Sequence, residues 1–147
     1  VIDCSHLNEG GFFDVAKLSK KPFMASHSCA RALCDHPRNL SDEQLRMLGE
    51  KGGVVGINFY GAFLNENGDA ASFYRIIEHL KYMKDKAGID TIALGSDFDG
   101  IDDNGELVDF RGYIPLMDIM SEHFSDDEID KISHINAMRV FRENIGR

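Results

Sequence analysis

The stretch GVVGINFY, residues 53–60, is apolar at almost every position and follows directly after Gly52. A short apolar run without polar alternation, bounded by a turn residue, is typical of a strand that is buried on both faces, as in a parallel sheet. Three other segments have the same character, and we expect strands there as well. They are VIDCSH (1–6), FMASHS (23–28) and TIALGSDF (91–98).

Helical patterns separate the expected strands. Ser41 with Gln44 and Ser125 with Glu128 both fit the capping box, so each pair predicts a helix that begins one residue after its serine. A third helix is predicted within residues 71–88, where apolar residues recur at helical spacing and form a stripe suited to covering a sheet. The stripe consists of Phe73, Ile76, Ile77, Leu80 and Met83.

Turn residues mark the ends of the expected helices. Gly52 and Gly88 are predicted to stop the helices that precede them. Ser28 predicts the cap of a further short helix, CARALCDH (29–36), which Pro37 would end. Strands that alternate with helices indicate βα units, and the sequence therefore predicts an α/β fold with a parallel sheet.

The composition argues against several classes of protein. The chain has 147 residues, of which 43% are hydrophobic, which suits one globular domain rather than a disordered segment. Its 25 acidic and 16 basic residues give a net charge of -9, so nucleic acid is not an expected partner. The apolar stretches fall short of the ~20 residues that span a bilayer, so no membrane partner is expected either.

The cysteines and the start of the chain bear on location and completeness. Three cysteines are an odd number without the spacing of a zinc finger, so they predict neither a complete disulfide framework nor a CxxC metal site. We therefore expect a reducing compartment and a cytoplasmic location. The sequence opens at Val1, inside an expected strand, without an initiator methionine. This start favours a fragment of a longer protein.

Polar residues end three of the expected strands, at His6, His27 and Asp97. Ligands of parallel α/β folds collect at the carboxyl ends of the strands, and one strand-helix-strand step brings the ends of neighbouring strands together. Two imidazoles placed in this way can share one metal ion. Ala93 and Gly95 are expected to face the same side as Asp97, and their small side chains suit a crowded interior.

Each of these positions also has a structural interpretation. A single strand-end histidine is more often a hydrogen-bonded structural group than a ligand, so the coincidence of three strand ends is what favours a metal site. Arg38 fits either an ion pair with Asp35 or Asp42, or a planar fork for a substrate carboxylate. Cys29 and Cys34 are interpreted as small packing residues rather than as a thiol site.

Five segments carry the expected strand ends and the last helix: DCSHLNEGGFFDV (3–15), ASHSCARALCDHPRNL (25–40), GGVVGINFY (52–60), ALGSDFDGI (93–101) and NAMRVFREN (136–144). In order and spacing they resemble the carboxyl-terminal half of the renal (membrane) dipeptidase family. The likeness spans nearly the whole chain, and chance rarely supplies several strand-end signatures in one order. That family is a (β/α)8 barrel with two zinc ions that cleaves dipeptides.

The resemblance implies a place in the barrel and a set of roles. Residues 1–147 would be the carboxyl-terminal half of a (β/α)8 TIM barrel, with its fifth to eighth strands and their helices. His6 and His27 match the two histidines that hold the second zinc ion. Arg38 matches the arginine that receives the terminal carboxylate of the substrate, and Asp97 matches the aspartate that contacts the substrate and handles protons at the scissile amide.

The resemblance also implies that part of the site lies outside this chain. The family's His-x-Asp pair, its bridging glutamate and a substrate-binding histidine come from the amino-terminal half, which is absent here. A complete site would hold two Zn²⁺ ions, of which this chain supplies the two-histidine part of one. We therefore expect the chain alone to be inactive and to pair with the missing half or with a second copy of itself.

The leading hypothesis is zinc-dependent hydrolysis of dipeptides by a metal-activated water. An alternative among enzymes is another metal-dependent amidohydrolase, such as a deacylase or a lactonase, because the same metals would cleave those bonds. A hypothesis of a different class is a non-catalytic half-barrel that self-associates through its exposed strand edges. A His-x-Asp pair and a glutamate upstream of the chain would favour the enzyme.

Overall fold

The structure is a computed structural model of the chain, and it describes residues 1–102, 105–107 and 109–146. Its strands are β1 (Met24–Ala25), β2 (Val54–Ile57) and β3 (Ile92–Leu94). The helices in the described residues are α1 (Glu9–Leu18), α2 (Asp42–Glu50), α3 (Gly61–Leu64), α4 (Phe73–Ala87), α5 (Tyr113–Met120), α6 (Asp126–Asp130) and α7 (Asn136–Ile145). Two 3-10 turns, η1 (Ile89–Thr91) and η2 (Phe110–Gly112), precede β3 and α5, and a π-helical turn, η3 (Lys131–Ile135), joins α6 to α7.

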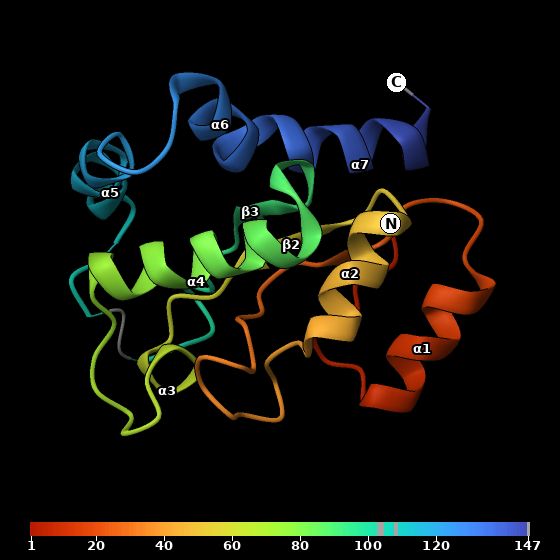
Figure 1. The fold of residues 1–147 in the computed structure, drawn as a ribbon, viewed down its shortest axis with the longest axis horizontal. Helices are drawn as coiled ribbons and strands as arrows, with labels where there is room; N and C mark the ends of the chain where they lie inside the picture. Colours follow the sequence, from red (N-terminus) through yellow and green to blue (C-terminus); the bar gives the residue numbers. More distant parts are fainter. Residues whose placement is uncertain (103–104, 108, 147) are drawn as a thin grey trace.

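The three strands are parallel and lie in the order β1-β2-β3, so each strand neighbours the next one in the chain. Met24 pairs with Val54 in one ladder, and Val55 pairs with Ile92 in the other. α2 connects β1 to β2, while α3 and α4 connect β2 to β3. Figure 1 shows α2 and α4 packed beside each other over the sheet. The predicted α/β fold with a parallel sheet is confirmed.

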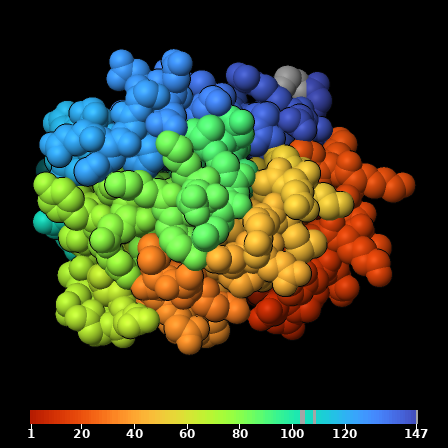
Figure 2. Space-filling model, viewed as in Figure 1, coloured from red at the N-terminus to blue at the C-terminus, as the bar shows by residue number. Residues whose placement is uncertain are grey.

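The core lies between the sheet and these helices. All four residues of β2 are buried, as its continuous apolar sequence predicts. Val55 and Ile57 belong to the main hydrophobic cluster, which also contains Leu45 and Leu48 from α2 and the buried face of α4. Figure 2 shows that side chains of α2, α4 and the carboxyl-terminal helices cover this side of the molecule.

Local signals in the sequence correctly place α2, α4 and α6. Both capping boxes form, at Ser41 before α2 and at Ser125 before α6. Gly88 ends α4 with a φ of 86°, a conformation that glycine adopts without strain. The apolar stripe of α4 also faces the core, with Phe73 partly buried and the other four residues buried: Ile76, Ile77, Leu80 and Met83.

α7 runs along the amino ends of the strands. Arg139 donates hydrogen bonds to the carbonyls of Gly52 and Gly53, just before β2, and to that of Asp90, just before β3. Asn144 donates to the carbonyl of Pro22, before β1, at 2.9 Å. These bonds satisfy carbonyls that precede the strands, and they leave the carboxyl ends of the strands for a site on the opposite side.

The first expected strand (1–6) is much shorter than predicted. Only a parallel bridge forms, between Asp3 and Met24, with hydrogen bonds from the amide of Cys4 to the carbonyl of Met24 (2.7 Å) and from the amide of Met24 to that of Ile2 (3.0 Å). The chain then turns, and the amide of Leu7 donates to the carbonyl of Cys4. The polar side chain of Asp3 binds both neighbouring segments, which ends the strand early.

The helix predicted over residues 29–36 is wrong. Ser28 does not cap it, because no hydrogen-bond partner of its hydroxyl is found in the part of the chain that the structure describes. The segment forms a loop that is closed by a parallel bridge between Ala30 and Leu40. Inside the loop, the side-chain amide of Asn39 donates to the carbonyls of Cys34 (2.9 Å) and Phe63 (2.8 Å). The bond to Phe63 ties the loop to α3, and a turn forms within it, where the amides of Leu33 and Cys34 donate to the carbonyl of Ala30.

The fourth expected strand (91–98) is likewise shortened. It begins one residue later, after η1, and its ladder ends at Leu94. Gly56 and Gly95 then approach each other so closely that a Cβ on Gly56 would lie 2.9 Å from the Cα of Gly95, which explains the small residues expected here. Asp97 has a φ of 67°, so the chain leaves the strand direction at this residue. Asp99 lies in the turn beyond it.

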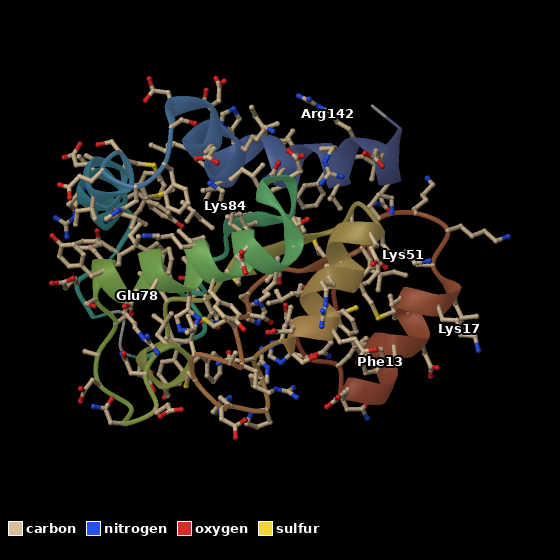
Figure 3. All side chains as sticks on the ribbon, in the orientation of Figure 1. Phe13, Lys17, Lys51, Glu78, Lys84 and Arg142 are labelled. Carbon is tan, nitrogen blue, oxygen red and sulfur yellow. The ribbon has the colours of Figure 1, made fainter. Side chains whose placement is uncertain are left out.

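Charged side chains occupy the outer faces of the helices. Lys17, Lys51, Glu78 and Arg142 are all exposed, and Figure 3 labels them on α1, at the end of α2, on α4 and on α7. Among the described residues, no helix combines the length and the apolar character that are needed to cross a bilayer.

Candidate active site

The expected strand ends meet at the carboxyl end of the sheet. His6 follows the bridge at Asp3, His27 follows β1, and Asp97 follows β3. The Nε2 atoms of His6 and His27 lie 2.9 Å apart, and the ring centroids are 4.9 Å apart. The structure therefore brings together the two histidines that the sequence predicts to share a metal ion, and their role as ligands stays a prediction.

A carboxylate that sequence reasoning missed holds both histidine-bearing segments. Oδ1 of Asp3 accepts hydrogen bonds from the amide (3.0 Å) and hydroxyl (2.9 Å) of Ser5 and from the amide of Ser26 (3.0 Å). Oδ2 accepts the hydroxyl of Ser26. Burial raises the pKa of Asp3, but these hydrogen bonds together outweigh it and hold the pKa below its usual value. The repeated Ser-His dipeptide, at 5–6 and 26–27, was the available signal.

The ring of His27 is oriented by this arrangement. Its Nδ1 lies 2.7 Å from Oγ of Ser26, and its backbone amide donates to Oγ of Ser5 at 3.0 Å. Burial lowers the pKa of His27 and outweighs the opposing attraction of Asp97. The neutral imidazole is the form that binds metal ions, so the site favours the state that a ligand needs.

Asn58 orients the carboxylate of Asp97. Asn58 directly follows β2 and is fully buried, and its Nδ2 donates to Oδ2 of Asp97 at 3.0 Å. Its own Oδ1 accepts the amide of Tyr60 at 2.6 Å, which fixes the direction in which the side-chain amide points. Gly100 lies against the other oxygen, where a Cβ would collide with Oδ1 of Asp97. Asn58 is thus a second site residue that sequence reasoning missed, although it directly follows a buried strand.

Arg38 lies beside the histidines rather than in an ion pair. Its Nε donates to the carbonyl of Ser5 at 2.9 Å, and its guanidinium lies 5.4 Å from the ring centroid of Phe63. Within the described ranges, no ion pair joins it to Asp35 or Asp42. Its Nη2 is buried and has no hydrogen-bond partner there. This unpartnered donor is consistent with a fork that receives an anionic group, and that role stays a prediction.

These side chains share one cavity of about 290 Å³ at the carboxyl end of the sheet. Three residues predicted from the sequence line it, and the ring of the fourth, His27, contacts His6. The sequence did not indicate the apolar and loop residues of the lining. The lining consists of His6, Arg38, Tyr60, Phe63, Asp97, Gly100, Ile101 and Asp102.

The cysteines do not form a thiol site. Cys4, Cys29 and Cys34 are buried and unpaired. Burial raises the pKa of the Cys4 thiol to about 11 and raises that of Cys29 as well. Protonated, buried thiols are poor nucleophiles, in agreement with the interpretation of Cys29 and Cys34 as packing residues.

Comparison with known proteins identifies the family. The membrane dipeptidase family (peptidase family M19) matches residues 1–146. The chain belongs to this family. An uncharacterized protein in the pqqA 5' region of Klebsiella pneumoniae is 43% identical over 145 residues, and the dipeptidase ataJ of Aspergillus terreus is 32% identical over 146 residues. These alignments cover 96% and 97% of this chain.

Solved structures of the membrane dipeptidase family share the fold. A metallopeptidase from Rhodobacter sphaeroides, solved with a phosphinate mimic of the dipeptide L-Ala-D-Ala, has a TM-score of 0.90 and 37% identity over 96% of this chain. The metallopeptidase described as dipeptidase AC has a TM-score of 0.92 and 37% identity over 99% of this chain. The chain spans only 41% and 44% of these two chains, and 54% and 36% of the Klebsiella and Aspergillus relatives.

A metal site of this metallopeptidase family needs more ligands than this chain shows. The described residues contain no group of three His, Cys, Asp or Glu side chains placed to hold a metal ion. His6 and His27 nevertheless fit as part of a ligand set, because their Nε2 atoms lie 2.9 Å apart and zinc takes imidazole nitrogens at ~2.0–2.1 Å. Their donor chemistry suits zinc, and the remaining ligands would have to come from outside the described residues.

Proposed function

We propose that the protein to which this chain belongs is a zinc-dependent dipeptidase, and that this chain supplies part of its active site. The observation that carries the proposal is the cavity in which His6, Arg38 and Asp97 meet, with His27 against His6, in a chain of the membrane dipeptidase family. The Rhodobacter relative, which was solved with a phosphinate mimic of the dipeptide L-Ala-D-Ala, supports the substrate class.

His6 and His27 are the residues that we assign to a zinc ion. The chemistry that zinc supplies when it is bound is Lewis acidity, which polarises an amide carbonyl and activates water at neutral pH. The role of this chain is to present two neutral imidazoles, those of His6 and His27, from adjacent segments. The hydrogen bond between His27 Nδ1 and Ser26 Oγ holds one of these rings in place.

Asp97 is the residue that we assign to proton transfer. Breaking an amide bond requires a proton on the departing nitrogen, and a carboxylate beside the substrate can hold that proton and release it. Because Oδ2 accepts the bond from Asn58, Oδ1 is the oxygen that we assign to the proton. The hydrogen bond from Asn58 already holds the carboxylate of Asp97 in position.

Arg38 is the residue that we assign to the substrate carboxylate. Its Nη2 carries donors without a partner in the described structure, whereas Nε is held by the carbonyl of Ser5. A carboxylate in the cavity would satisfy the buried donors, and the ring of Phe63 supports the guanidinium from the side. Recognition of this carboxylate would restrict hydrolysis to substrates with a free carboxyl terminus.

We propose further that the chain forms part of a larger (β/α)8 barrel. β3 has a neighbour on only one side among the described residues, and an apolar groove of about 480 Å³ runs beside it, lined by Leu94, Phe98, Phe110, Tyr113 and Met117. Open strand edges and apolar grooves are covered in stable proteins. An amino-terminal half of the protein, or a second copy of the chain, would cover the edge of β3 and the groove. The same partner would supply the missing metal ligands. The three unpaired thiols support a reducing, cytoplasmic location.

A comparison of substrate classes tests the proposed function. The complete protein, loaded with zinc, is assayed with three substrates. They are a dipeptide, the N-acetylated form of the carboxyl-terminal amino acid of that dipeptide, and a lactone. We expect the dipeptide to be hydrolysed with the highest kcat/KM and the activity to depend on Arg38. The lactone has neither an amide nor a free carboxylate. The acetylated amino acid has both at the spacing of a dipeptide, but it lacks the amino-terminal residue. Hydrolysis of the lactone or the acetylated amino acid in preference to the dipeptide would overturn the proposal.

A further inference from the structure

We infer that Asp3 is a positioning residue that sets, through the hydroxyl of Ser26, which ring nitrogen of His27 carries the proton. The inference rests on the proposed function, because it concerns how His27 is prepared for a metal ion. Asp3 contacts neither the cavity nor the ring of His27, and it acts through one intervening side chain.

The hydrogen bonds form a continuous chain from Asp3 to His6. Oδ2 of Asp3 contacts the hydroxyl of Ser26, whose Oγ lies 2.7 Å from Nδ1 of His27. On the far side of the ring, Nε2 of His27 lies 2.9 Å from Nε2 of His6. The same carboxylate binds Ser5 through Oδ1, so it joins the two Ser-His segments at their base.

Counting protons along this chain leaves one arrangement. An ionised carboxylate only accepts hydrogen bonds, so the single hydroxyl proton of Ser26 must be donated to Asp3. Oγ of Ser26 then acts as the acceptor for His27, and Nδ1 of His27 must carry the ring proton. A neutral imidazole has one N–H group, so Nε2 of His27 is left with its lone pair exposed toward His6.

This arrangement prepares His27 as a ligand before any metal arrives. A metal ion binds the bare nitrogen, and a proton held at Nε2 would have to be displaced first. In the absence of metal, the lone pair of His27 Nε2 accepts a hydrogen bond from Nε2–H of His6, which accounts for the short distance between the two rings. Asp3 thus selects the tautomer of one histidine of the pair.

The variant Asp3→Asn tests the inference, because it reverses the direction of the chain of hydrogen bonds. The Oδ1 of Asn still accepts from the amides of Ser5 and Ser26, so the local fold is kept. Its Nδ2, however, takes the place of Oδ2 and donates to Oγ of Ser26. The hydroxyl proton of Ser26 is then free to turn toward Nδ1 of His27, which moves the ring proton to Nε2 and covers the nitrogen that should bind the metal.

The tautomer is measured by long-range ¹H–¹⁵N correlation spectra of the complete, zinc-free protein with ¹⁵N-labelled histidine. The signals of His27 are identified as those lost in His27→Gln. We expect Nδ1–H in the wild type and Nε2–H in Asp3→Asn. Zinc affinity is measured separately, by competition with a chromophoric chelator, and we expect Asp3→Asn to weaken it by about 10- to 100-fold, the usual effect of losing a partner that orients a ligand.

Two further variants separate this role from a structural one. Ser5→Ala removes the hydroxyl bond to the same carboxylate and the acceptor of the His27 backbone amide, but it leaves the contact of the His27 ring with Ser26, and we expect the wild-type tautomer to be retained. Ser26→Ala removes the intervening hydroxyl, and we expect a mixture of tautomers. If Asp3→Asn fails to fold, the comparison of Ser26→Ala with Ser5→Ala still decides the inference.

The possible results distinguish the inference from the function on which it rests. Nε2–H in the wild type, or an unchanged tautomer in Asp3→Asn and Ser26→Ala, would overturn the inference. Equal loss of zinc in Asp3→Asn and Ser5→Ala with no change of tautomer would make Asp3 a structural residue only. Zinc binding that survives His27→Ala would instead overturn the metal assignment, whatever the tautomer spectra show.

Discussion

The Nε2 atoms of His6 and His27 lie 2.9 Å apart although 21 residues separate them in the chain. The parallel bridge between Asp3 and Met24 creates this proximity, because each histidine follows its bridge partner by three residues and parallel segments run in register. The relationship between the two rings is thus set by backbone pairing and then adjusted by the carboxylate of Asp3.

Replacing either histidine should remove zinc. In the complete protein, His6→Ala or His27→Ala leaves one imidazole where two are assigned, so we expect one zinc ion per site to be lost, together with nearly all dipeptidase activity. Metal content is measured by atomic absorption and activity with a free dipeptide. His134→Ala is the matched control, because His134 is exposed on η3, and it should keep both. Full zinc content in the His27 variant would contradict the assignment.

Replacing Asp97 should impair turnover without removing the metal. Asp97→Asn keeps the shape of the side chain but cannot accept a proton, so we expect kcat to fall by roughly 10²-fold or more while zinc is retained. Asp99→Asn is the control, since Asp99 is exposed and lies two residues further along. A kcat for Asp97→Asn within a few fold of the wild type would show that the proton is handled elsewhere.

Replacing Arg38 should affect substrates according to their carboxyl terminus. Arg38→Ala removes the unpartnered donors, so we expect kcat/KM for a free dipeptide to fall by about 10- to 100-fold, the usual worth of a hydrogen-bonded charge. The corresponding dipeptide amide, which lacks the charge, should be affected much less. The two substrates are assayed side by side with wild type and variant. Equal losses for both would assign Arg38 a structural role through its bond to Ser5.

Acid should destabilise the fold through His79. This residue is fully buried in α4, where Nδ1 accepts the amide of Ala30 at 3.1 Å and Nε2 lies 3.1 Å from the carbonyl of Leu64. Burial lowers the pKa of His79 to about 4 from the usual 6.5. The folded state therefore resists protonation of His79. The contribution of His79 to the free energy of unfolding is fully present above pH 6.5 and is lost as the pH falls toward 4.

The size of this effect can be measured by urea unfolding. A lowering of this size corresponds to about 3 kcal/mol of unfolding free energy between neutral pH and pH 4. In the complete protein, the variant His79→Gln should be less stable at neutral pH, because the bond to Ala30 is lost, and its stability should depend less on pH. The same pH dependence in variant and wild type would show that other groups are responsible.

Sequence reasoning succeeded where the signal was local. The capping box at Ser41 involves two residues three positions apart, and it predicts the start of α2 correctly. It failed where a side chain binds across the fold: Asn39 bonds to Phe63, which no helical pattern over residues 29–36 reveals. Asp3 was missed for the same reason, because the Ser26 group that it binds is 23 residues away.

The chain on its own should be neither a stable monomer nor an active enzyme. Its exposed apolar residues include Phe110, which lines the groove beside β3, and Ile114 on α5, with 77% and 71% of their surface exposed. Leaving apolar surface in water forfeits about 25 cal/mol per Å², and net stabilities are only about 5–15 kcal/mol. Covering this surface should therefore be worth a large share of the stability.

We expect the isolated 147-residue chain to self-associate in sedimentation velocity experiments, to bind zinc weakly through two histidines, and to hydrolyse no dipeptide. Adding the remaining part of the protein as a separate chain should restore turnover, because it would cover the open strand edge and supply the missing metal ligands. As a matched control, the same addition to a chain with His27→Ala should restore the assembly but not the activity. A monodisperse monomer of this chain that hydrolyses dipeptides would mean that all the ligands lie within it.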